Sequence, residues 1–77
     1  MAGLVYFRKV FEDSEVVRYD FGDDPDSFSR RLTMKKAPRT SVADDDLVDY
    51  AFLKASRKIN ALHAERGHWP ERGMSVS

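Results

Sequence analysis

The chain has 77 residues, enough for one small domain, and its 13 basic residues balance 13 acidic residues to a formal net charge of zero. It contains no cysteine, which excludes disulfides and thiolate zinc sites, so packing or a partner subunit must supply the stability. The sequence has no apolar run near the roughly 18 residues of a membrane span, and its start lacks the pattern of a signal peptide. We therefore expect a cytoplasmic protein without membrane contact.

Charge is distributed in blocks along the chain, although it sums to zero. Seven acids and one base lie between residues 12 and 26, whereas five bases and no acid lie between residues 30 and 39. Four aspartates follow between residues 44 and 49. Such blocks can give faces of opposite charge, and the charge of a face influences which partners bind it.

The first half of the chain predicts three antiparallel strands. Residues 3–11 are rich in β-branched and aromatic residues, residues 15–22 alternate such residues with polar ones, and the short polar turn between the two segments is typical of a β-hairpin. Residues 30–36 alternate again and predict a third strand. Pro38 is expected to end that strand, because proline has no N–H for a ladder hydrogen bond.

The first strand carries large apolar side chains on both faces. Strict alternation places Val5, Phe7 and Phe11 on one face and Tyr6 and Val10 on the other. The sequence alone leaves open which face is buried. Because a small monomer cannot bury both faces, we expect part of this apolar surface to lie at an interface.

A helix is predicted over residues 42–66. Apolar residues recur at spacings of three and four, and Ser41 with Asp44 resembles an N-terminal capping box. Aspartates 44–46 would then lie in the first turn, where the helix dipole favours negative charge, and Gly67 would end the helix. The apolar stripe of this helix consists of Val48, Phe52, Ala55, Ile59 and Leu62, with Ala51 beside it.

The predicted fold is therefore α+β: a three-stranded antiparallel sheet, made of a β-hairpin plus a third strand, packed by one long C-terminal helix. A single domain would span residues 1–67. Residues 68–77 show no periodicity and are expected to form a tail that Trp69 anchors to the core and whose last residues are loose.

The sequence gives little support to catalytic or metal-binding motifs. The aspartates in residues 20–26 lack the spacing of a calcium loop, and His63 and His68 flank Gly67 instead of sharing one helix face. There is no glycine-rich phosphate loop and no serine in a nucleophile-elbow sequence. We therefore expect no enzymatic activity, no metal, no cofactor and no small-molecule substrate.

The sharpest functional prediction is a basic outer face on the sheet. If Leu32 and Met34 face the helix, the bases of the third strand point outward and join those of the hairpin. An ordinary solvated sheet face remains an alternative, because antiparallel sheets often expose Arg, Lys and Thr on one side. The residues expected to bind a partner are Tyr6, Arg8, Arg18, Arg31 and Lys35 on the sheet, with Tyr50, Leu53 and Arg57 on the rear of the helix.

The expected function is that of a small non-catalytic interaction module, which binds a protein partner or a second copy of itself. Arginine and lysine would steer the encounter, and aromatic and leucine side chains would supply buried area. The alternative is a nucleic-acid-binding domain that reads or tracks DNA or RNA with the same basic face. The formal charge of zero favours protein over nucleic acid, because nucleic-acid-binding domains of this size are usually basic.

Overall fold

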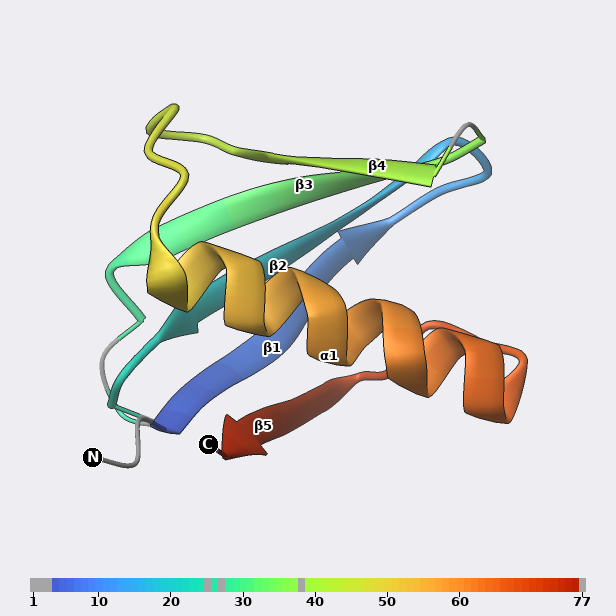
Figure 1. Cartoon of the computed structure of the whole chain (residues 1–77). Helices are drawn as coiled ribbons and strands as arrows, with labels where there is room; N and C mark the ends of the chain where they lie inside the picture. The colour runs from blue at the N-terminus through green and yellow to red at the C-terminus, as the bar shows by residue number, and fades with distance from the viewer. Residues whose placement is uncertain (1–3, 25, 27, 38, 77) are drawn as a thin grey trace.

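A computed structural model describes residues 4–24, 26, 28–37 and 39–76, and it shows an antiparallel sheet crossed on one face by a helix (Figure 1). The spatial order of the strands is β4-β3-β2-β1-β5. The described elements are β1 (Leu4–Glu12), β2 (Val16–Gly22), β3 (Arg30–Lys36), β4 (Arg39–Ala43), α1 (Tyr50–Arg66) and β5 (Arg72–Val76). The predicted boundary residues Gly3 and Pro38, and Ser77 of the predicted tail, lie outside the described residues.

The structure confirms the α+β class and the antiparallel sheet, but the sheet has five strands where three were predicted. The β1–β2 hairpin and β3 lie where alternation predicted them. The missed strands are β4, which pairs with β3, and β5, which pairs with β1. Because β5 follows α1, the helix is not the last element, and residues expected in a tail form the edge of the sheet.

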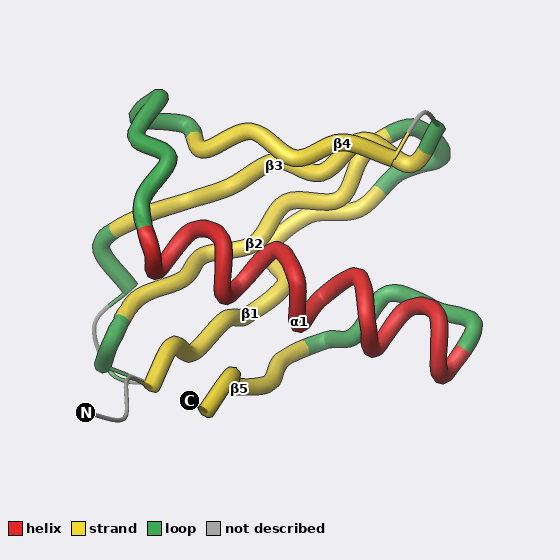
Figure 2. Tube along the Cα trace, in the orientation of Figure 1, coloured by secondary structure: helices red, strands yellow, loops and turns green. Residues whose placement is uncertain are grey.

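The prediction that the helix begins at residue 42 was wrong, because α1 begins at Tyr50. Ala43 belongs to β4 and pairs with Leu32, so the chain must turn before it can enter a helix. Figure 2 shows this turn as the loop between β4 and α1. Asp49, not Ser41, is the N-cap, and its side chain accepts a hydrogen bond from the backbone N–H of Phe52 at 3.0 Å.

The C-terminal end of the helix and most of its apolar stripe lie where they were predicted. Four members of the apolar stripe are buried, whereas Val48 precedes α1 and is 66% exposed. Gly67 ends the helix in the left-handed region, at a φ of 79°, and its N–H donates to the carbonyl of His63. Within the described part of the chain, no helix is long and apolar enough to span a membrane.

The core lies between α1 and the face of the sheet that the helix covers. The Phe7 and Tyr19 rings meet edge to face at 5.6 Å, and Phe21 packs against Phe52 at 6.3 Å. The buried side chains of the sheet alternate along the strands, which settles the face that the sequence left open. The core side chains are Val5, Phe7, Val17, Tyr19, Phe21, Leu32, Met34, Ala43, Phe52, Ala55, Ile59, Leu62 and Trp69.

Trp69, which follows the helix, is buried in the core. Its ring is 7% exposed and stacks on His63, with 4.1 Å between the ring centroids. The hydroxyl of Tyr19 donates a hydrogen bond of 2.5 Å to the carbonyl of Pro70, and burial raises the pKa of that hydroxyl above its usual value. These contacts place the following residues beside β1, where they form β5.

An irregularity in β1 reverses one predicted side-chain direction. The register of β1 with β2 shifts between Lys9 and Phe11, so that Phe11 lies opposite Arg18. Phe11 is 44% exposed and does not join the buried face, where strict alternation had placed it with Phe7. The bulge therefore moves an aromatic ring onto the face of the sheet opposite the helix.

Arg30 links the start of β3 to the segment before α1. Its Nη1 donates to both carboxylate oxygens of Asp49 at 2.8 Å, and its Nε bonds Asp45 at 2.8 Å. Nη2 adds a bond of 2.9 Å to the carbonyl of Leu47, and the guanidinium lies over the Phe21 ring. Asp45, which was predicted to lie in the first turn of the helix, and Asp49 therefore bind Arg30 and fix the segment before α1 to β3. The first turn of α1 contains no acid.

Candidate functional site

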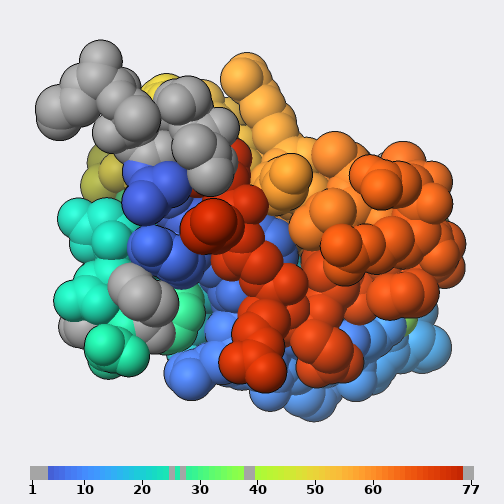
Figure 3. Space-filling model, turned by 90° about the horizontal axis from the view of Figure 1, so that it is seen from below, coloured from blue at the N-terminus to red at the C-terminus, as the bar shows by residue number. Residues whose placement is uncertain are grey.

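One face of the sheet carries the helix, and the opposite face, which we call the bare face, has no helix over it (Figure 1). The space-filling view from below shows β5, in red, between the helix and the N-terminal strands (Figure 3). Residues that alternate with the core positions point to the bare face. Among the described side chains on it are Tyr6, Arg8, Phe11, Arg18, Asp20, Arg31, Thr33, Lys35, Thr40, Val42, Arg72 and Met74.

A row of charged residues crosses the bare face from β5 to β3. Arg72 pairs in register with Arg8, Arg8 with Asp20, and Asp20 with Arg31. Asp20 bonds the Nε of Arg31 at 2.8 Å and lies 3.7 Å from a terminal guanidinium nitrogen of Arg8. The Asp20 hydrogen bond raises the pKa of Arg31, and Asp44 nearby acts in the same direction. The carboxylates therefore gather toward β3, and the β1–β5 side is left with an excess of positive charge.

Two arginines of the bare face lie over aromatic rings. The guanidinium carbon of Arg8 is 4.8 Å from the centroid of Phe28, which belongs to the β2–β3 loop. The guanidinium carbon of Arg18 is 5.3 Å from the centroid of Phe11. Cation–π contacts of this kind hold a guanidinium near an aromatic surface while its N–H groups stay available to a partner. The bare face therefore combines charge with apolar area.

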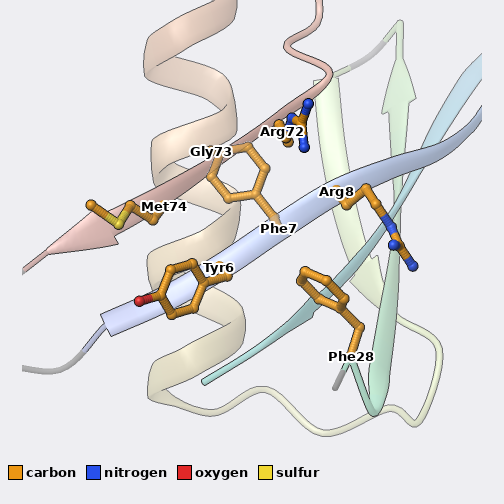
Figure 4. A pocket seen from close by; sticks show the side chains of 7 residues that line it. All are labelled: Tyr6, Phe7, Arg8, Phe28, Arg72, Gly73 and Met74. Atoms are coloured by element: carbon orange, nitrogen blue, oxygen red, sulfur yellow. The ribbon is translucent and has the colours of Figure 1, made fainter. Parts of the chain in front are cut away.

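A pocket of about 310 Å³ opens on the bare face between β1 and β5. Figure 4 shows its lining, to which β1 contributes Tyr6 and Arg8, β5 contributes Arg72 and Met74, and Phe28 adds an aromatic ring. The remaining lining residues are Phe7 and Gly73. A Cβ on Gly73 would lie 2.8 Å from Cζ of the Phe7 ring, so glycine is needed for β5 to approach this closely.

The structure divides the predicted binding residues into two groups on opposite sides of the molecule. Five lie on the bare face, where Lys35 is opposite Val16 at the end away from the pocket. Tyr50, Leu53 and Arg57 are exposed on α1, on the side of the helix that faces away from the sheet. The ring of Tyr50 also carries Lys54, at 5.3 Å. A single flat contact cannot include both groups.

Sequence reasoning missed the residues that complete the pocket. Met74 and Arg72 lie on β5, which was not predicted, and Phe28 lies in a loop that alternation does not reach. The five residues of β5, Arg72–Val76, include few apolar ones and show no alternation that could have marked this strand in the sequence. The described residues contain no group of three or more His, Cys, Asp or Glu side chains that could bind a metal ion.

Comparison with known proteins found no matching protein-family model, no matching curated protein and no matching solved structure. The functional inference therefore comes from the geometry and charge of this chain. The feature that a small packed domain does not require is the bare face, with its arginines, the exposed Phe11 ring and the pocket.

Proposed function

We propose that this chain is a non-catalytic interaction module that binds a protein partner through the bare face of its sheet. The observation that carries the proposal is the joint presence of basic and apolar side chains on a sheet face that no helix covers. Phe11, Val42 and Met74 are each more than two-fifths exposed there, and Arg8 and Arg18 lie among them. Arginine, methionine and aromatic residues are the types that protein interfaces favour.

The rear of α1 is the second part of the proposed interaction surface. Tyr50 and Leu53 expose apolar area there, and Arg57 adds a positive charge. Because this side faces away from the bare face, it serves a separate contact, such as association with a second copy. Light scattering of the wild-type chain and of Leu53→Asp tests this part: a concentration-dependent dimer that the substitution removes supports it, and a monomer in both removes it.

The bare face is tested by selecting binders from a library of random peptides with the whole chain as bait. The bare-face variant combines Arg8→Ser, Arg18→Ser and Lys35→Ser, all at exposed positions. We expect selected peptides to bind the wild type and Leu53→Asp alike, and to lose about tenfold or more in affinity for the bare-face variant. Selection of no peptides, or peptides that bind the bare-face variant equally well, would contradict the proposal.

Nucleic-acid binding through the same face is the second candidate, favoured by the exposed Phe11 ring near Arg18, since rings and cations together bind single strands. Its prediction is retention of DNA or RNA in a mobility-shift assay, lost steeply with added salt and reduced by Arg31→Ala with Lys35→Ala. No retained nucleic acid at low salt removes this candidate and leaves the protein interface.

A further inference from the structure

Two arginines of the bare face lie directly opposite each other on neighbouring strands. Arg8 of β1 is the register partner of Arg72 of β5, and like charges in that position destabilise a sheet. Arg8 reaches Asp20 only at 3.7 Å, and Asp20 is already bonded to Arg31 at 2.8 Å. Arg72 forms no ion pair with any residue that the structure describes. An anion from outside the chain would relieve this arrangement.

The space next to the two guanidinium groups is apolar. Tyr6 and Met74 form the neighbouring cross-strand pair, and Phe28 lies beside them in the wall of the pocket (Figure 4). The ring of Phe7 adds apolar surface where Gly73 has no side chain to cover it. The pocket volume of about 310 Å³ is large enough for one bulky aliphatic or aromatic side chain.

We infer that this pocket binds an acidic segment of a partner protein, an inference that rests on the proposed function of the bare face. One apolar side chain of the segment fills the pocket, and a carboxylate next to it in the sequence lies between Arg8 and Arg72. Guanidinium groups bind carboxylates with paired hydrogen bonds, which fixes the direction of the segment. The positive β1–β5 side also speeds the encounter with an acidic chain.

Charge complementarity favours an acidic protein segment over two other occupants. A second copy placed face to face would set arginines against arginines, because the carboxylates of this face are already paired within the chain. A nucleic-acid strand needs a series of cations for successive phosphates, whereas Asp20 and Asp44 interrupt the cations of this face. The formal net charge of zero also suits a short acidic contact better than a long polyanion.

The test uses a blocked five-residue peptide with a central leucine between two pairs of acidic residues, added to the isotope-labelled whole chain. We expect saturable amide shifts confined to residues 5–8, 28 and 72–75. Arg72→Ala should weaken binding about tenfold. The matched control is Lys58→Ala, which removes one positive charge from an exposed position of α1, the helix that covers the other face of the sheet, and should leave binding unchanged. Serine in place of the leucine should also weaken binding.

Four results would overturn the inference: no saturable shifts, equal binding of a peptide with lysines in place of the acids, equal loss in Lys58→Ala, or stronger shifts of the same amides with oligothymidylate. The library selection separates this inference from the proposed function. Selected peptides that need the bare face but carry no acidic residues would leave the proposed function standing and remove the acidic segment. Selection of no peptides would remove both.

Discussion

The substitution Arg30→Ala tests whether the guanidinium of Arg30 fixes β3 to residues 45–49, the segment before α1. The side chain is 17% exposed and bonds two carboxylates and the carbonyl of Leu47, while it lies 4.7 Å from the centroid of Phe21. The carboxylates are partly exposed, so those ion pairs contribute little each. The carbonyl hydrogen bond and the ring contact supply most of an expected loss of about 2 kcal/mol in the free energy of unfolding.

Urea unfolding followed by the fluorescence of Trp69, which is buried in the native state, measures this loss. In a thermal scan the same loss lowers Tm by roughly 8–16 °C for a domain of this size. Arg30→Lys keeps the charge but not the planar set of donors, so its stability should lie between those of the wild type and Arg30→Ala.

Arg31→Ala is the matched control, because it removes a neighbouring arginine of the same strand. The side chain of Arg31 is 49% exposed and bonds one carboxylate, that of Asp20. We expect its effect on stability to be clearly smaller than that of Arg30→Ala. Equal losses in the two variants, or a loss below about 0.5 kcal/mol in Arg30→Ala, would refute the role assigned to Arg30.

Three further predictions concern the same framework. Gly73→Val should loosen β5 and speed hydrogen exchange of residues 72–76, because its Cβ would lie 2.8 Å from the Phe7 ring. Tyr19→Phe should cost about 1–2 kcal/mol in urea unfolding, because it leaves the carbonyl of Pro70 without its donor. The guanidinium of Arg30 lowers the pKa of Asp49, so this pair should contribute its whole stabilisation above the ordinary pKa of 3.8 and lose it as the pH falls further. In acid titrations of the free energy of unfolding, Arg30→Ala should therefore show a shallower decrease.

The central strands could be predicted from the sequence, whereas the edge strands could not. β2 and β3 each alternate apolar and polar residues over five positions, which is the local signal of a half-buried strand, and β1 is rich in β-branched and aromatic residues. β4 and β5 have five residues each and few apolar ones, so pairing with a distant neighbour determines them. The same pairing moved the helix start, since both Ser41 and Asp49 are residue types that cap helices.

The part of the candidate site that lies on the central strands could be predicted from alternation, whereas the part on the edge strand β5 could not. Arg8, Arg18 and Arg31 follow from alternation with buried neighbours, and the structure places all of them on the bare face. Phe11 did not follow, because a bulge changes the alternation that the prediction assumed. Arg72 belongs to an edge strand that only tertiary pairing defines, so the arginine pair across β1 and β5 could not be seen in the sequence.

The ion pairs of the fold explain part of the block distribution of charge along the chain. Much of the basic block is neutralised within the fold: Arg30 by the aspartates before α1, Arg31 by Asp20, and Lys36 by Glu12. Among the bases of the sheet whose side chains the structure describes, Arg18, Lys35 and Arg72 have no ion pair, and Arg8 has one long contact. All four lie on the bare face. The folded sheet thus pairs Arg30, Arg31 and Lys36 with carboxylates of the same chain. The other four bases named here belong to the bare face, for which we propose a partner.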